Sequence, residues 1–285
     1  MVILLRQAIL AFAIATLMAY RGYKRKSLTT NGAVAAWIVG FLSITLGMRG
    51  FLLLLFYIVG TKATKHKSKI KKQLDTSAED SSCRGPSQVL ACSIVGLVLQ
   101  LIHYVYCRDE RSISFISTGD DSQLASSLAC AIIAHHATNL ADTLSSELGI
   151  LSTSDPILIT NGKKVPRGTN GGISKTGLIC SILGGFIIGV GTLLIDTMNG
   201  FDVQSVPIIL FGIVCGAFGS IIDSILGATL QITYFDQDKK VVSDTPKNNA
   251  VRIAGMDVLS NTQVNLVSVL ITSALGFIGG PLFFR

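Results

Sequence analysis

Charged residues are scarce in this sequence. Asp, Glu, Lys and Arg make up only 14% of its 285 residues, whereas soluble domains carry roughly 25%. Hydrophobic residues account for 49% of the chain, and the mean hydropathy is +0.56. Apolar stretches of bilayer-spanning length recur along nearly the whole chain. The composition therefore excludes an appended soluble catalytic domain and predicts a single integral membrane domain over residues 1–285.

Several motifs of soluble enzymes are also missing. The cysteines form no Cys-x-x-Cys pair, and no His and Cys spacing suits a metal site. The chain has no Walker A spacing and no Ser-His-Asp arrangement. These absences exclude the metallohydrolase and serine hydrolase classes. They leave six cysteines without an assigned role, namely Cys83, Cys92, Cys107, Cys130, Cys180 and Cys215.

Apolar runs divided by polar or basic stretches predict eight membrane segments. The run at 50–60 is short for a span, so residues 32–60 form a tight hairpin broken at Gly47 and Gly50, a single long helix or a re-entrant pair. The predicted fold class is an all-α, polytopic transmembrane helical bundle of about seven or eight segments. The runs are 4–20, 32–46, 50–60, 87–106, 122–143, 177–198, 206–233 and 262–282.

The distribution of basic residues predicts the orientation of these segments. Short cytosolic loops carry an excess of Lys and Arg, and one side of the predicted bundle receives 19 of the 24 basic residues. That side holds a basic loop at 61–86 and a Gly-rich loop at 148–176. The net charge of +7 is therefore explained by topology and does not indicate a nucleic-acid partner. We expect a first helix that is retained, because Arg21 and the basic residues after it follow the apolar run instead of preceding it. Both termini are predicted to be lumenal or external.

Polar side chains gather at the predicted cytosolic ends of the helices. The opposite ends have few polar residues apart from short acidic stretches such as Asp109 to Glu110 and Asp120 to Asp121. Asp142 and Glu147 lie where the fifth segment ends, and carboxylates there oppose the helix dipole. A bound Mg²⁺ would remove that penalty, and salt bridges to nearby lysines are the structural alternative. The two residues are five apart, so they converge only if the helix ends between them. Asp223 is a second carboxylate in an apolar segment, and it also needs a partner.

A glycine-rich, basic stretch precedes the sixth segment. Glycines let backbone N–H groups converge on an anion, and a helix N-terminus presents further donors. Such a loop alone is weak evidence of a phosphate site, but an acidic helix end followed by it is how a Mg-nucleotide site would be divided. The candidate residues are Arg167, Gly168, Thr169, Asn170, Gly171, Gly172 and Lys175.

The same residues resemble the transmembrane protein 19 family, whose plant members include phytyl-phosphate kinase. The resemblance covers nearly the whole chain in order. It rests on Thr30 to Ala36, Gly60 to Lys65, Arg84 with Gln88, Ala141 to Gly149, Val165 to Gly172, Asp223 to Ala228 and Asn261 to Asn265. The order of acidic and Gly-rich elements is also similar to that of CTP-dependent polyprenol and phytol kinases.

The resemblance implies roles for individual residues. Asp142 and Glu147 would bind Mg²⁺, and Asp223 would be a second metal ligand or a base for the acceptor. Residues 167–172 and Lys175 would cradle the phosphates of CTP or another nucleotide. The phosphate of the acceptor would be held by Lys62, Lys65 and Arg84.

The leading hypothesis is a nucleotide-dependent kinase of an isoprenoid or related lipid monophosphate at the cytosolic face of an internal membrane. The endoplasmic reticulum is favoured, because the N-terminus enters a helix directly and does not resemble a plastid transit peptide. One alternative is a transporter or flippase of an anionic lipid or phosphate-bearing metabolite, and another is a non-catalytic assembly protein. A transporter is expected to carry polar residues through the full membrane depth. The sequence does not indicate an oligomeric state.

Overall fold

The computed structural model describes all residues except 1, 76–82, 117–119, 247–248 and 285. Part of the predicted basic loop, 76–82, therefore lies outside the described residues. Each of the eight predicted segments is helical. The helices are α1 (Val2–Lys24), α2 (Thr30–Leu46), α3 (Phe51–Lys65), α4 (Ser68–Leu74), α5 (Pro86–Ala91), α6 (Ile94–Cys107), α7 (Asp120–Gly149), α8 (Lys175–Met198), α9 (Ser205–Leu230) and α10 (Asn261–Gly279), with short 3-10 turns η1 (Met48–Gly50) and η3 (Gly280–Leu282).

Two predicted segments are interrupted in the structure. Of the three alternatives for residues 32–60, the structure shows the hairpin broken at Gly47 and Gly50. α2 ends at Leu46 with Gly47 as its C-cap, and η1 leads into α3. A Cβ at Gly50 would collide with the backbone carbonyl of Ser43 in the last turn of α2, so the hairpin closes tightly because position 50 has no side chain. The segment predicted at 87–106 divides into α5 and α6 around Cys92 and Ser93.

The central helix of the bundle is α7, which packs against α3, α6, α8, α9 and α10. Small residues make this possible. An added Cβ at Gly184 of α8 would lie 2.5 Å from Ala141 Cα, and one at Gly219 of α9 would meet Thr138. Glycine at helix contacts lets backbones approach closely, as in membrane bundles. The stretch of α7 from Leu128 to Ala141 is therefore almost wholly buried by protein.

Among the described residues, three helices are long and apolar enough to cross a membrane: α8, α9 and the segment Asn261–Leu282. Two shorter apolar helices, α2 and α6, accompany them. The described residues therefore support a helical protein with membrane-spanning segments, while the total of seven or eight crossings stays a prediction.

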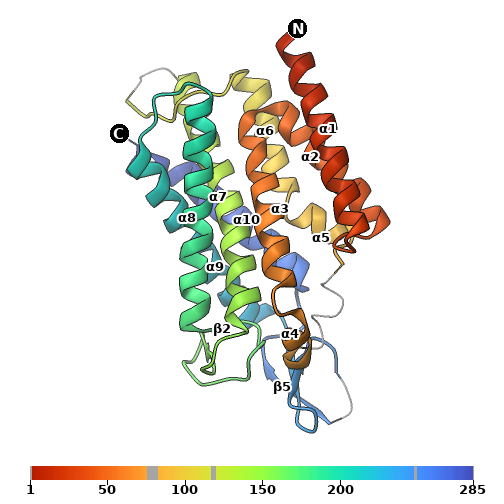
Figure 1. Ribbon diagram of the computed structural model, residues 1–285. Helices are drawn as coiled ribbons and strands as arrows, with labels where there is room; N and C mark the ends of the chain where they lie inside the picture. Colours follow the sequence, from red (N-terminus) through yellow and green to blue (C-terminus); the bar gives the residue numbers. More distant parts are fainter. Residues whose placement is uncertain (1, 76–82, 117–119, 247–248, 285) are drawn as a thin grey trace.

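The prediction of an all-α chain was incomplete, because five short strands lie at one end of the bundle (Figure 1). They occur in the stretches expected to be loops. One sheet has the order β4-β3-β5 and the other pairs β1 with β2, all antiparallel. We call this end, which also carries α4 and the Gly-rich loop, the basic end. The strands are β1 (Ile157–Leu158), β2 (Gly172–Ile173), β3 (Thr233–Asp236), β4 (Val241–Ser243) and β5 (Ala250–Ala254).

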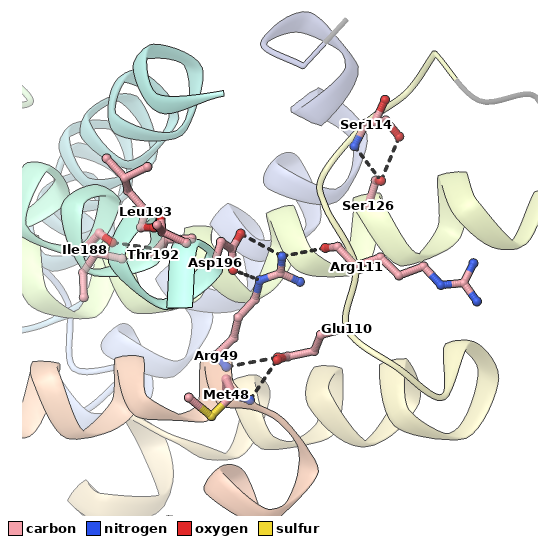
Figure 2. A network of polar contacts seen from close by, with 11 residues as sticks. Met48, Arg49, Glu110, Arg111, Ser114, Ser126, Ile188, Thr192, Leu193 and Asp196 are labelled. Atoms are coloured by element: carbon pink, nitrogen blue, oxygen red, sulfur yellow. Dashed lines mark hydrogen bonds and ion pairs between the residues drawn. The ribbon is translucent and has the colours of Figure 1, made fainter. Parts of the chain in front are cut away.

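The expectation that the end opposite the basic end has few polar side chains was wrong. Arg49, 1% exposed, donates from Nε and Nη2 to the two carboxylate oxygens of Asp196 at 3.0 and 2.9 Å, and Nη2 also donates to the carbonyl of Arg111 (Figure 2). The Glu110 carboxylate accepts from the backbone N–H groups of Met48 and Arg49. Burial raises the pKa of Glu110, and the nearby Arg49 charge opposes that shift. The pairing of Arg49 with Asp196 was not predicted, because the two residues lie 147 positions apart in the sequence.

Candidate functional site

Two carboxylates from different helices meet near the basic end. Asp142 of α7 and Asp223 of α9 face each other within hydrogen-bonding reach. Ser268 of α10 donates its hydroxyl to Asp223 Oδ2 at 2.9 Å. Both Asp side chains keep some exposure, whereas Ser268 is buried. We call Asp142 and Asp223 the acid pair. Facing carboxylates repel unless they share a proton or a cation, so this arrangement is suited to binding positive charge.

Glu147 does not join the acid pair. α7 continues to Gly149, so Asp142 and Glu147 lie on different faces of one unbroken helix. The Glu147 carboxylate instead accepts from the Nζ of Lys71, which is buried. Lys71 also donates to the carbonyls of Ala63 and Thr64 at the end of α3, at 3.0 and 2.6 Å. The salt-bridge alternative is therefore the one observed for Glu147.

The glycine-rich stretch of the Gly-rich loop, residues 165–172, packs against α9. Gly171 has a φ of +74°, and a Cβ there would collide with Ala228 and the carbonyl of Ser224. This contact lies one turn beyond Asp223 and brings the loop close to the acid pair. The backbone N–H groups of Thr169, Asn170 and Gly172 already donate to protein oxygens. A phosphate cradle formed by the loop would therefore depend on other donors than these three.

The basic residues predicted to bind phosphate do not converge on the acid pair. Arg167 lies 4.0 Å from Asp155, and Lys175 is exposed in the first turn of α8. Lys62 is exposed, and the exposed Lys65 donates to the carbonyl of Arg25 at 3.0 Å. These side chains lie at the surface of the basic end.

Arg84 is the predicted phosphate ligand that the structure holds in a half-buried position. Its backbone pairs with the turn before α2: its N–H donates to Ser27, and its carbonyl accepts from Thr29. The guanidinium lies over the Phe56 ring, 5.9 Å from the centroid. It is also 3.8 Å from where a Cβ would stand on Gly60 of α3. Its backbone anchors thus fix this cation at the start of α5.

An apolar pocket opens between α1, α2, α3 and α5, with Arg84 at its rim. Its cavity volume is about 80 Å³, and most of its lining is hydrocarbon. The polar side chains that line it include Arg84 and Gln88, both on the segment that begins α5. The apolar lining includes Ile14, Met18, Val39, Ile44, Leu53, Leu54 and Phe56.

Cys92 is a lining residue of this pocket that also lies near the acid pair. Its side chain lines the pocket, and its thiol lies within the electrostatic reach of Arg84, Asp142 and Asp223 together. The backbone carbonyl oxygen of Cys92 lies 3.2 Å from His135 Nε2 of α7. One end of the apolar pocket therefore approaches both a fixed cation and two carboxylates.

The comparisons with known proteins agree with this architecture. Residues 13–273 match the family described as integral membrane protein DUF92. The chain belongs to this family. It is an integral membrane family that includes the transmembrane protein 19 type and plant phytyl-phosphate kinase, so the resemblance seen in the sequence is confirmed.

Individual relatives occur in a plant and in an archaeon. The chain is 35% identical to Protein PGR of Arabidopsis thaliana, over 97% of each chain. It is 29% identical to an uncharacterized membrane protein, MJ0933, of Methanocaldococcus jannaschii, over 89% of this chain and 86% of that one. It is 31% identical to Protein VTE6, chloroplastic, of Arabidopsis thaliana, over 56% of this chain and 45% of that one. No solved structure matches.

Sequence reasoning missed Lys71 and Ser268. Lys71 is one of six lysines between residues 62 and 72, and nothing in that run distinguishes the buried one. Ser268 lies one helical turn after the Asn261 to Asn265 motif, so the periodicity of α10 could have placed it beside Asn265. The apolar pocket had no sequence signal, because its lining residues look like ordinary lipid-facing side chains.

Proposed function

We propose that this protein transfers a phosphoryl group from a nucleotide to an isoprenoid monophosphate. The observation that carries the proposal is an apolar pocket whose lining includes Arg84 and Cys92, with the Cys92 thiol within the electrostatic reach of the acid pair. Membership of a family that contains a phytyl-phosphate kinase supports it. We further propose that the site faces the cytosol from the endoplasmic reticulum or another internal membrane, as the charge distribution suggests.

The apolar pocket suits the hydrocarbon chain of such an acceptor. A chain leaving the bilayer would enter between helices that the lipid already surrounds, and burial against this lining contributes roughly 25 cal/mol per Å² of apolar surface. Arg84 would hold the acceptor phosphate at the pocket rim. A guanidinium suits phosphate because its planar donors match two phosphate oxygens.

The acid pair suits a magnesium ion. Mg²⁺ takes one or two protein carboxylates and completes its shell with water and phosphate oxygens, and the two facing carboxylates offer that donor set. When bound, the ion would supply neutralisation of the nucleotide phosphates. This assignment replaces the pairing of Asp142 with Glu147. The second carboxylate is that of Asp223 on α9, and the hydroxyl of Ser268 on α10 holds it in place.

The nucleotide, CTP or another, would bind on the loop side of the acid pair. The Gly-rich loop packs on α9 one turn from Asp223. The half-buried Arg167 and the exposed Lys175 add positive charge at that side. Phosphoryl transfer depends mainly on positioning and charge neutralisation. The two substrates would thus meet between Arg84 and the acid pair.

The test is an assay of labelled phosphoryl transfer from CTP and ATP to a panel of isoprenyl monophosphates with Mg²⁺, using purified protein in detergent. We expect transfer by the wild type and a loss of roughly 100-fold or more in Asp142→Asn and Asp223→Asn, because each removes charge stabilisation in the transition state. Asp257→Asn, an exposed carboxylate at the same end, is the matched control and should retain activity.

Glu147 provides an internal comparison. If it served only to pair with Lys71, Glu147→Gln would affect stability more than the metal dependence of transfer. No transfer to any monophosphate by folded wild-type protein, together with no nucleotide binding, would refute the kinase proposal. Binding of a phosphate-bearing lipid without its modification would instead favour the transporter alternative.

A further inference from the structure

The turn between α1 and α2 carries concentrated positive charge. Its exposed cations are Arg21, Lys24, Arg25 and Lys26. No Asp or Glu precedes Asp75 in the sequence, and among the described residues none of these cations takes part in an ion pair. The orientation of the membrane segments explains why the cations lie on this side. It does not explain why two of them line a cavity.

The cavity lies against this turn and has a volume of about 620 Å³. Lys24 and Lys26 contribute two ammonium groups to its lining, and two threonines contribute hydroxyls. Thr29 Oγ1 accepts from the N–H of Gly32 at 3.0 Å, so the hydroxyl hydrogen is not used in that bond. A lining of cations and hydroxyls suits an anion with several acceptor oxygens, such as a phosphate. The remaining lining residues are Tyr23, Leu28, Thr30 and Cys83.

Backbone hydrogen bonds hold the walls of this cavity in place. The N–H of Arg84 donates to the carbonyl of Ser27 at 3.0 Å, and the carbonyl of Arg84 accepts from the N–H of Thr29 at 3.1 Å. Leu28, between these two contacts, is buried and lines both this cavity and the apolar pocket. The cavity, which we call the basic cavity, is therefore preformed and separated from the apolar pocket by Leu28.

Two tyrosines place the basic cavity at the depth of lipid headgroups. Tyr20 and Tyr23 are exposed in the last turns of α1, and exposed tyrosines of membrane helices prefer the interface between hydrocarbon and water. Lys24 Nζ lies 5.8 Å from the centroid of the Tyr20 ring, which keeps this ammonium group near the same level. A ligand of the basic cavity can thus come from the bilayer itself.

An exposed apolar row on α2 begins at the basic cavity. Thr30 lines the cavity, and the next three residues at intervals of four are aliphatic and exposed. They are Val34, Ile38 and Leu42. This spacing places them on the same face of α2 as Thr30. A molecule whose charged group lies at Thr30 can therefore extend a hydrocarbon chain along the row.

We propose that the basic cavity binds the phosphate of an anionic phospholipid, with an acyl chain of the same lipid along Val34, Ile38 and Leu42. Free inorganic phosphate has the same chemistry, but only a lipid uses both the cavity and the row. Basic clusters at the cytosolic end of a membrane helix attract anionic lipids, whereas the ammonium group of a zwitterionic lipid compensates its own phosphate. The inference does not depend on the kinase proposal.

The thiol of Cys83 reports whether the basic cavity is occupied, because this half-buried residue lines it. Its rate of modification by a maleimide is followed by mass spectrometry in neutral detergent, during titration with short-chain phosphatidylglycerol. We expect phosphatidylglycerol to slow the reaction, whereas equal concentrations of inorganic phosphate or of phosphatidylcholine with the same chains do not. Met256→Cys, at an exposed position before α10, controls for a general effect of anionic lipid on thiols and should not be protected.

Lysine substitutions test the two cations. We expect Lys24→Gln and Lys26→Gln each to raise the concentration for half-protection of Cys83 roughly fivefold, because a lysine near a lipid surface contributes about that factor in affinity. Lys69→Gln removes an exposed lysine outside the cavity and should leave that concentration unchanged. Absence of protection, equal protection by inorganic phosphate, or no effect of Lys24→Gln and Lys26→Gln would overturn the proposal.

The acyl chain is tested with Trp37, the single tryptophan of the sequence. It follows Val34 by three residues and precedes Ile38, so it lies beside the row, and bromine on a lipid chain quenches tryptophan fluorescence on contact. In phosphatidylcholine bilayers with equal small fractions of either brominated lipid, we expect brominated phosphatidylglycerol to quench more than brominated phosphatidylcholine. The double variant Lys24→Gln with Lys26→Gln should abolish the difference. Equal quenching by the two lipids in the wild type would overturn the proposal of a bound lipid.

Discussion

Arg49 and Asp196 form an ion pair that is buried on both sides, at the end of the bundle opposite the acid pair. Removing charges from water is expensive, and the attraction between them compensates only because the geometry is bidentate and a further carbonyl accepts from the guanidinium. The pair joins the α2–α3 hairpin to the end of α8. Its role is therefore to hold three distant segments in one arrangement.

Removing one member of this pair should destabilise the protein strongly. We expect Asp196→Asn or Arg49→Met to lower the free energy of unfolding by about 3–5 kcal/mol, because each leaves a buried charge unpaired. The double variant Arg49→Met with Asp196→Leu should lose less than either. Denaturant unfolding in detergent measures this, with exposed Arg25→Met as the control. Additive losses in the double variant would show that the two charges do not compensate each other.

At the scale of elements, hydrophobic runs were sufficient to locate the helices, because a bilayer-exposed helix must be apolar along its length. They could not locate the strands. β3, β4 and β5 are three to five residues long, so their alternation of side chains is too short to detect. Basic residues in the same stretch also made it look like an ordinary cytosolic loop.

The site was predictable to the same limited extent. Asp142 and Asp223 could be singled out because they are carboxylates in costly positions, whereas Arg84 was singled out only through the family resemblance. The sequence does not reveal their partners: Glu147 is paired with Lys71, 76 residues away, and the partner of Asp142 lies on another helix. Spacing along one helix restricts which side chains share a face, whereas convergence of different helices depends on packing.

The docking of the Gly-rich loop on α9 yields a paired prediction. Gly171 and Gly162 both have positive φ, +74° and +68°, but only Gly171 faces atoms that a Cβ would strike. Alanine costs roughly 1 kcal/mol of backbone strain at either position. We expect Gly171→Ala to lose considerably more stability, and also phosphoryl transfer, because the loop must leave α9. Equal effects in thermal unfolding and in the transfer assay would show that the contact with Ala228 is unimportant.

At the scale of the whole molecule, one end of the bundle carries the sheets, the Gly-rich loop and the acid pair. The start of α1 and the end of η3 lie toward the other end (Figure 1). The apolar pocket lies beside α1 and α2, on the flank away from α8 and α9. A substrate that is half hydrocarbon and half phosphate can reach such a site from the bilayer without crossing the protein core.

The central claim is that this pocket and the acid pair form one site for an isoprenyl phosphate. Photo-crosslinking with an isoprenyl monophosphate that carries a diazirine at the end of its chain tests it most directly, with mass spectrometry to locate the label. The account predicts labelling of pocket residues such as Val39, Ile44 and Leu53, abolished by unlabelled monophosphate and by Arg84→Met. Labelling confined to exposed lipid-facing residues such as Leu194 and Leu210, or unchanged in Arg84→Met, would contradict it.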